Sequence, residues 1–486
     1  MRFVFSILTT CLFLSVSATA GQVETDYFAV LISGSKIGYS MHTRSVDNGL
    51  VTTSDDLKLT FKREDDVLNV GVLLTSFETI DGRPRGFKHT QDLSTMKKTV
   101  EGKITADGKL RLITKQIDET IKRTMDYPAG ALMAEGLRLL GLEKGLKPGT
   151  IYETTYFSTE LLAPLKTEIT VGQTENIDLF GRVLPLTKVQ TVMTSPLFSL
   201  SVVSYVDEKF KERKVIMPML GEELEFVSCN RQFALSDNDL VDFLDGMLLR
   251  SPVEMKNIDS ASSATYYLKP IAGAKLNIPV SAAQTVKQKR DSVIAVTVEP
   301  VAPAASVSFP YKGKDRRALV ALKPTEYLQT GDEKVLALAA AAVGDAEDAA
   351  IAAKRIEAFV KGYISEKDLS VGYASAAEVA LSRQGDCTEH AVLTAAMCRA
   401  VGIPARIVVG IVYADEFTGR TNIFGGHAWN EVYIGGRWVD LDSTRAPKGF
   451  GPGHIRLASG SGRPADFFNM ASTLGYFTIT KVTLRQ

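Results

Sequence analysis

The sequence has 486 residues, in which 56 basic residues (Lys and Arg) balance 56 acidic residues (Asp and Glu). This balance leaves no strong basic field of the kind that nucleic-acid binding requires, and the hydrophobic content of 45% is typical of a globular chain rather than a disordered one. A chain of this length has room for about two to four domains, each with its own core.

The first twenty residues differ from the rest. Arg2 is followed by an apolar run that ends near Val16, and small residues then lead to Ala20. This order predicts a secretory signal peptide over residues 1–20, cleaved after Ala20. No other stretch approaches the ~20 apolar residues of a membrane-spanning helix. We therefore expect an exported protein with no transmembrane segment after signal removal, located in the periplasm or, alternatively, outside the cell.

Removal of the signal would leave three cysteines, an odd number in an oxidising compartment. Cys387 and Cys398 stand eleven residues apart on one predicted helix. At 1.5 Å per residue they are about 16 Å apart, which is beyond the reach of a disulfide. Cys398 is most simply a small core residue, and Cys229 has the same simple interpretation.

Residues 21–235 predict a β-rich N-terminal domain. Strands are expected at 28–32 and 37–41, a hairpin with an Asp-Gly turn at 104–110, and one helix at 128–142. Strands at this spacing indicate an antiparallel sheet or half-open barrel of about 200 residues. His42 and His89 are isolated in this region, and we interpret them as surface or strand-face residues rather than ligands.

Residues 236–322 predict a helical connector and a small β middle domain. The connector helix is expected at 239–248 and strands at 265–268, 275–280 and 292–298. Three prolines near its end indicate a semi-rigid linker.

Residues 323–486 form the third predicted domain. It opens with helices at 332–343 and 345–363, the second with one apolar stripe, and it closes with a strand near 476–484.

Within this domain Cys387 stands at the start of a helix predicted over 388–400. Asp386 precedes it as a helix cap. A thiol in the first helical turn lies among free backbone N–H groups at the positive end of the helix dipole, which favours the thiolate. Cys387 is therefore a candidate nucleophile.

Two further candidates follow on a predicted hairpin, in which strands at 426–434 and 437–442 flank a Gly-Gly turn. Counting back from the turn puts Trp429 opposite Asp442, so that His427 and Asp442 share a face as diagonal neighbours, about 7 Å apart or less. The rival acid, Asp440, falls opposite Glu431 and roughly 13 Å from His427. Asp442 is the better partner for the imidazole.

A thiolate that attacks a carbonyl, an imidazole that moves the proton and a carboxylate that orients the imidazole form a known catalytic set. Four motifs occur here in order: Gly385-Asp386-Cys387-Thr388-Glu389-His390-Ala391, Arg399-Ala400-Val401-Gly402-Ile403-Pro404-Ala405-Arg406, His427-Ala428-Trp429-Asn430-Glu431-Val432-Tyr433 and Trp438-Val439-Asp440-Leu441-Asp442-Ser443-Thr444. They resemble the transglutaminase-like branch of the papain-type thiol enzymes, over about residues 325–460.

The resemblance implies an α+β fold, in which a Cys-bearing helix packs on an antiparallel sheet, here preceded by β-rich domains. It implies Cys387 as nucleophile, His427 as base and Asp442 as the third catalytic residue. Ser443 is a departure, because the family often has Pro after the Asp.

Other residues near the motifs have two interpretations each. Gln384 is a candidate oxyanion donor, and Trp429 and Trp438 would line the acyl pocket or simply pack. His390 could form a Cys-x-x-His zinc pair with Cys387, but zinc needs two more ligands, so helix packing is the simpler interpretation. His454 has no assigned role. We expect no cofactor and no metal.

The expected reaction is acyl transfer on protein or peptide amides through a thioester. Hydrolysis is favoured, as in a cysteine peptidase or amidase, because nothing in the sequence specifies an amine channel or a calcium site. The alternatives are a transglutaminase that cross-links glutamine to an amine and a non-catalytic exported scaffold or binding protein. The substrate and the oligomeric state are not encoded in any pattern that we recognise.

Overall fold

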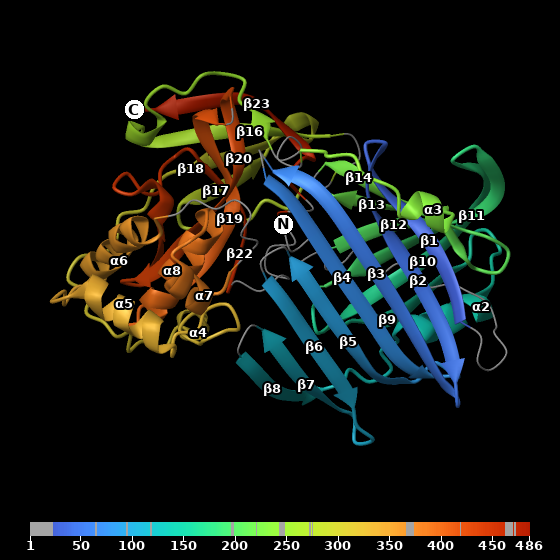
Figure 1. The fold of residues 1–486 in the computed structure, drawn as a ribbon. Coiled ribbons are helices and arrows are strands. Elements are labelled where there is room, and N and C mark those ends of the chain that lie inside the picture. The colour runs from blue at the N-terminus through green and yellow to red at the C-terminus, as the bar shows by residue number, and fades with distance from the viewer. Residues whose placement is uncertain are drawn as a thin grey trace. The chain divides into compact units, whose positions relative to one another are not determined.

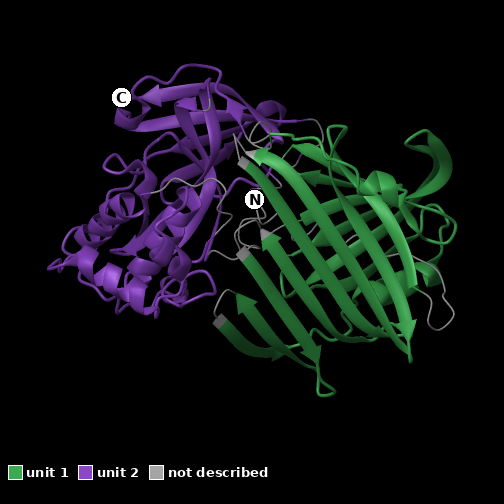
Figure 2. Ribbon diagram, viewed as in Figure 1, with its two compact units in different colours: residues 1–243 green, residues 244–486 purple. Residues whose placement is uncertain are grey.

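The computed structural model describes residues 23–486, except for 64–65, 94–95, 117–118, 196–198, 220, 243–247, 272–273, 275, 366–373, 418, 462–469 and 471–472. The predicted signal peptide lies outside the described residues. The chain divides into two compact units, residues 1–243 and residues 244–486 (Figure 2). Helices and extensive antiparallel sheets are both present, which confirms the α+β class and the β-rich N-terminal region.

Unit 1 contains one 14-stranded antiparallel sheet (Figure 1). Its first meander consists of β1 (Val23–Ile32), β2 (Ser35–Asp47), β3 (Leu50–Arg63), β4 (Asp66–Thr79), β5 (Pro84–Leu93), β6 (Met96–Ile104), β7 (Lys109–Gln116) and β8 (Glu119–Asp126). The second consists of β9 (Ile151–Ser158), β10 (Ala163–Leu179), β11 (Arg182–Thr194), β12 (Ser199–Val206), β13 (Glu212–Met219) and β14 (Glu222–Cys229). The two meanders join where β1 pairs with β14, and β8 and β9 are the edges.

The strands form because apolar residues alternate with polar ones, which gives the sheet one buried face. In β3 the buried side chains include Leu57, Leu59 and Phe61, the alternation that the sequence shows. The hairpin of β6 and β7 likewise spans the predicted Asp-Gly turn.

The helix α2 (Ala134–Lys144) begins at Ala134 rather than at residue 128, where the sequence pattern placed it. Its own N-cap residue makes no side-chain cap hydrogen bond. Instead Glu78, on β4, accepts hydrogen bonds from the backbone N–H groups of Glu135 at 2.7 Å and Gly136 at 2.9 Å. A carboxylate from a distant strand therefore sets the helix start.

The connector helix predicted at 239–248 is not present in residues 239–242, which are irregular except for an isolated β-bridge between Asp242 and Lys62. They follow the short helix α3 (Arg231–Ala234), and Asp239 is held to β2 because its N–H donates to the Lys36 carbonyl while its carboxylate accepts from the Lys36 N–H. These long-range hydrogen bonds replace the helical ones. Residues 243–247 of the predicted helix lie outside the described residues.

Unit 2 contains two antiparallel sheets. The larger consists of β15 (Leu249–Arg250), β20 (Arg420–Ile434), β19 (Ala405–Phe417) and β22 (His454–Gly460) in this order, with β21 (Arg437–Leu441) also paired to β20. The smaller has the order β17 (Gln284–Gln288), β18 (Ile294–Val298), β16 (Ser263–Pro270) and β23 (Phe477–Arg485). Because β23 pairs with β16, the strands of the predicted middle region share a sheet with the C-terminal strand.

Residues 276–280, which were predicted to be part of a strand, are irregular in the structure. Pro279 interrupts the run, and proline has no N–H to donate to a β ladder. Its carbonyl instead accepts a hydrogen bond from the Gln284 side chain at 2.8 Å.

The helices of unit 2 lie on one side of the larger sheet, which α8 and α6 contact directly (Figure 1). They are α4 (Arg316–Val320), α5 (Glu333–Val343), α6 (Ala349–Tyr363), α7 (Ala376–Ser382) and α8 (Cys387–Ala400), with 3-10 turns η2 (Ile258–Ser260), η3 (Arg290–Ser292) and η4 (Ser443–Arg445). The helix α8 contacts β19 and β20 on one side and α5, α6 and α7 on the other. Among the described residues, no helix is long and apolar enough to cross a membrane.

Candidate active site

The helix α8 places Cys387 in its first turn. The Asp386 carboxylate accepts from the Thr388 N–H at 2.9 Å. It also forms a capping box with Glu389, in which the Asp386 side chain accepts from the Glu389 N–H and the Glu389 carboxylate accepts from the Asp386 N–H at 3.1 Å. Gly385 is required in front of this cap because its φ is +147° and an added Cβ would lie 2.3 Å from the Glu389 Cβ. Cys387 is half-buried, so its thiol is partly accessible at the helix N-terminus.

The hairpin of β20 and β21 has the register that the two-residue turn predicts. Ile434 pairs with Arg437 and Glu431 pairs with Asp440, while both turn glycines have positive φ values of 60° and 85°. The ladder ends at the pair of Asn430 and Leu441, and Asp442 then caps the turn η4. The local pattern thus brings Asp442 beside the strand that carries His427.

The His427 ring connects the thiol with the carboxylate. Its Nε2 lies 2.8 Å from Asp442 Oδ2, and the Cys387 side chain is close enough to the ring to affect its pKa. Burial by itself lowers the pKa of His427, but the charge and hydrogen bond of Asp442, together with Cys387, raise this pKa to about 10. The imidazole is therefore held in its protonated form at neutral pH.

Asp442 is fully buried and accepts four hydrogen bonds. Its Oδ2 accepts from His427 and from His454, the latter at 3.0 Å, and its Oδ1 accepts from the Thr444 N–H at 3.0 Å and the Thr444 hydroxyl at 2.5 Å. Burial alone raises the pKa of this carboxyl, but His427 and His454 hold it well below its usual range. The Asp442 N–H also donates to Glu357 on α6 at 2.8 Å, which fixes the backbone.

The rival acid has a different partner. Asp440 accepts from the indole N–H of Trp429 at 2.9 Å, and its burial beside Glu431 raises its pKa above the usual range. A carboxyl held toward its neutral form is poorly suited to stabilise an imidazolium. The geometry therefore pairs His427 with Asp442, as the register argument predicted.

The two tryptophans have separate surroundings. Trp429 stacks with His427 at a centroid distance of 6.2 Å, so it covers one side of the imidazole. Trp438 packs with Tyr433 at 5.3 Å and lies under the Arg406 guanidinium at 4.1 Å. Both are buried, and Trp429 is the one that the structure brings to the His427 ring.

Gln384 and His390 flank the thiol in sequence. Gln384 is half-buried directly before Gly385, and its oxyanion role stays a prediction. His390 is buried, and its Nδ1 lies 2.7 Å from the Asp386 carbonyl, as expected of a residue that packs the helix start. Burial lowers the pKa of His390. Cys398 lies fully buried further along α8, and Cys229, Cys387 and Cys398 are all free thiols.

Two residues at the site were not found from the sequence. Glu357 stands within the helical pattern of α6, which indicates packing but not that its carboxylate would accept from Asp442. His454 lies in a segment rich in Gly and Pro, where no strand was predicted, yet β22 pairs with β19 and brings it to Asp442. The 2.8 and 3.0 Å separations of Asp442 Oδ2 from the two imidazoles are hydrogen-bond distances, so we interpret the three side chains as a hydrogen-bond network.

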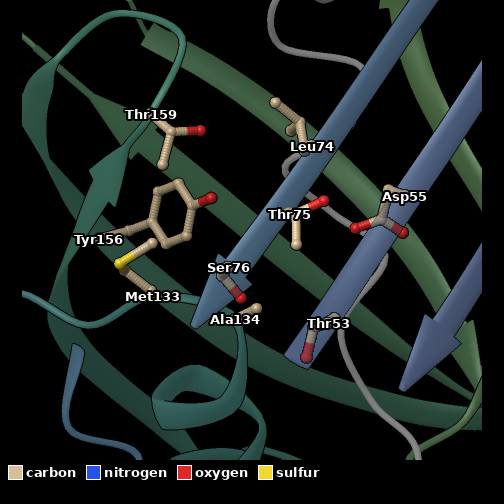
Figure 3. A pocket seen from close by; sticks show the side chains of 9 residues that line it. All are labelled: Thr53, Asp55, Leu74, Thr75, Ser76, Met133, Ala134, Tyr156 and Thr159. Atoms are coloured by element: carbon tan, nitrogen blue, oxygen red, sulfur yellow. The ribbon is translucent and has the colours of Figure 1, made fainter. Parts of the chain in front are cut away.

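Unit 1 has a small cavity of about 20 Å³ (Figure 3). It is lined by Thr53, Asp55, Leu74, Thr75, Ser76, Met133, Ala134, Tyr156 and Thr159. This volume suits about one water molecule rather than a substrate. Beside it, Asp55 pairs with His42 at 2.8 Å, and His42 and His89 are buried strand-face residues rather than surface ones.

Comparison with known proteins supports the assignment of the C-terminal domain. A family model described as the transglutaminase-like superfamily matches residues 336–443, a range that includes Cys387, His427 and Asp442. This part of the chain is therefore a transglutaminase-like domain. A search of curated proteins gave no match.

Three solved structures are similar to parts of the chain. A candidate cysteine protease from Cytophaga hutchinsonii is 20% identical, with 46% of this chain and 83% of that chain covered and a TM-score of 0.29. A β-barrel-like protein of a domain of unknown function from Brucella abortus is 13% identical, with 44% and 98% covered and a TM-score of 0.33. A candidate protease from Parabacteroides distasonis is 10% identical, with 72% and 69% covered and a TM-score of 0.19.

Proposed function

We propose that the transglutaminase-like domain transfers acyl groups from protein or peptide amides through a thioester at Cys387. The observation that supports this is the grouping of the Cys387 side chain, the His427 ring and the ionised Asp442 carboxylate, in which Cys387 helps to raise the pKa of His427 and the ring lies 2.8 Å from Asp442. An adjacent base activates a cysteine nucleophile, and a carboxylate behind that base fixes its orientation.

The proposed reaction begins with the attack of the Cys387 sulfur on the amide carbonyl carbon. The new C–S bond gives a tetrahedral intermediate, and His427 donates its proton to the amine as the C–N bond breaks. A water molecule then attacks the thioester while His427 takes its proton, and the C–S bond breaks to release the acid. Asp442 stays ionised throughout and stabilises the imidazolium.

The first turn of α8 supports the proposal with donors for the oxyanion. Backbone N–H groups at a helix N-terminus have no intrahelical acceptor, and the Cys387 N–H lies in that turn. Such a donor acts on the negative charge that develops on the carbonyl oxygen. We propose Gln384 as a second donor because it directly precedes Gly385 and Asp386, which lead into the start of α8 at Cys387.

The acyl acceptor distinguishes the candidate activities. With water as acceptor the protein is a cysteine peptidase or amidase, the activity that we propose, and with a lysine-like amine it is a transglutaminase. A non-catalytic scaffold would need no thiol beside the imidazole of a His–Asp pair. We further propose that the protein is exported through residues 1–20 and acts in the periplasm.

The deciding experiment uses residues 21–486, incubated with a library of glutamine-containing peptides with and without a primary amine. Products would be followed by mass spectrometry beside a Cys387→Ala variant. Cleaved or deamidated peptides support hydrolysis, and amine adducts would establish transfer instead. Absence of any Cys387-dependent product would favour the scaffold.

A further inference from the structure

His454 is a second imidazole beside Asp442 and is 1% exposed. Its Nε2 is 3.0 Å from Asp442 Oδ2, the same oxygen that accepts from His427. Its Nδ1 faces the backbone of Gly451, with the carbonyl oxygen at 2.9 Å and the N–H at 3.3 Å. Both nitrogens of this buried ring are thus engaged.

The direction of the bond to Asp442 follows from the chemistry of the acceptor. An ionised carboxylate can only accept hydrogen bonds, so His454 Nε2 carries a proton in either charge state of the ring. Oδ2 consequently receives two N–H donors, one from each imidazole.

Aromatic side chains fix the plane of the His454 ring. Phe450 lies at a centroid distance of 4.7 Å, and Trp429 meets the ring edge-on at 5.1 Å. The strand β22 fixes its backbone because His454 pairs with Val412 of β19. An unbonded imidazole in such surroundings would be costly to bury, whereas a phenyl ring would pack there without cost, so packing alone does not explain a histidine here.

The need for a second donor arises from the position of Asp442. The β ladder ends one residue earlier, at Leu441, and Thr444 holds only Oδ1. Without His454, Oδ2 would depend on His427, the group that gains and loses its proton during the reaction. A donor that keeps its proton holds Oδ2 in place at every step.

We propose that His454 is a positioning residue for the thiol chemistry, which holds Asp442 ionised and aimed at His427 through a permanent N–H···O hydrogen bond. This inference rests on the proposed function of Cys387. The charged groups that face the His454 ring are Asp442, His427 and Arg445.

The test measures the rate at which iodoacetamide alkylates Cys387 in residues 21–486, followed by mass spectrometry of the Cys387 peptide, so no substrate is needed. At pH 6 an ordinary thiol reacts slowly because little of it is thiolate, whereas at pH 10 most thiols are ionised. His454→Phe keeps the aromatic packing and removes the donor. His454→Gln restores an N–H close to the position of Nε2.

We expect His454→Phe to react about tenfold more slowly than the parent at pH 6, the factor that one lost hydrogen bond to a charged group supports. At pH 10 it should match the parent within about twofold, and His454→Gln should recover most of the pH 6 rate.

An unchanged pH 6 rate in His454→Phe overturns the inference. So does a loss of the same size at both pH values, which indicates damaged packing, or a His454→Gln variant as slow as His454→Phe. The failure of the proposed function has a separate signature: the parent itself would react no faster at pH 6 than His427→Ala.

Discussion

Each unit of this protein buries a His–Asp pair with the same 2.8 Å separation. In unit 1 His42 and Asp55 face each other across β2 and β3, and in unit 2 His427 contacts Asp442. Burial dominates at Asp55 and raises its pKa, whereas His427 and His454 together hold the pKa of Asp442 well below its usual range. The causes that lower the pKa of Asp55 come from one imidazole, whereas those that lower the pKa of Asp442 come from two.

A second difference concerns what lies beyond the imidazole. A half-buried thiol at a helix N-terminus also acts on the His427 ring, whereas the His42–Asp55 pair lies beside a cavity sized for water. A buried His–Asp pair is therefore a structural feature in one sheet and one part of a candidate catalytic chain in the other.

The largest predicted effect tests the thiol. Cys387→Ala should lower turnover by about 10⁴-fold or more, the scale on which loss of a nucleophile acts. Turnover would be measured on the best peptide found in the library. Cys229→Ser is the matched control, because Cys229 is a free thiol in unit 1 and should retain full activity. An equal loss of turnover in both variants would contradict the conclusion that only the thiol in unit 2 takes part in the reaction.

The next prediction separates the two neighbouring acids. Asp442→Asn should lower kcat by about 10² to 10⁴-fold because the amide can no longer stabilise the imidazolium. Asp440→Asn should cost less than about tenfold, because Asp440 bonds Trp429 and its pKa is raised toward the neutral form. The reverse order in steady-state kinetics would show that the pairing of His427 with Asp442 does not matter to the chemistry.

The contribution of His427 to the stability of unit 2 should decrease as the pH rises above neutral. The pKa of His427 is about 10 in the folded protein and 6.5 in the unfolded chain. The stabilisation that the protonated imidazole provides is therefore fully present below pH 6.5 and is lost as the pH rises toward about 10. Between pH 7 and 8.5 the stability advantage of the parent over His427→Ala should shrink by about 2 kcal/mol. Both tryptophans lie in unit 2, so denaturant unfolding followed by tryptophan fluorescence reports this unit. An advantage that stays constant over this range would contradict the raised pKa.

His89 should have the opposite effect in unit 1, where the free energy of unfolding should decrease as the pH falls. Burial lowers the pKa of this imidazole to about 3, so the unfolded chain binds more protons below pH 6.5 and the folded unit loses stability as the pH falls. The loss should be at most about 2 kcal/mol between pH 6.5 and 5, and His89→Leu should reduce it. Circular dichroism at β-sheet wavelengths would follow unit 1, and a loss of equal size in both proteins would place the effect elsewhere.

Much of the candidate site could be predicted because its geometry is local. The helix start at Cys387 follows from a capping pattern within four residues, and the contact between His427 and Asp442 follows from a two-residue turn and the period of a strand. Such features depend on residues that are close in sequence, so they can be predicted from the types of residue and their spacing. The same holds for the alternating strands of unit 1.

The remaining features depend on residues that are far apart in sequence. Glu78 sets the start of α2, the pairing of β16 with β23 joins the middle region to the C-terminus, and His454 supplies the second donor to Asp442. A hydrogen-bond acceptor on one element does not specify which distant element will donate to it, and only packing decides that choice. The sequence by itself therefore determined the thiol, its helix and the His427–Asp442 pair, while the tertiary structure decided what holds that pair in place.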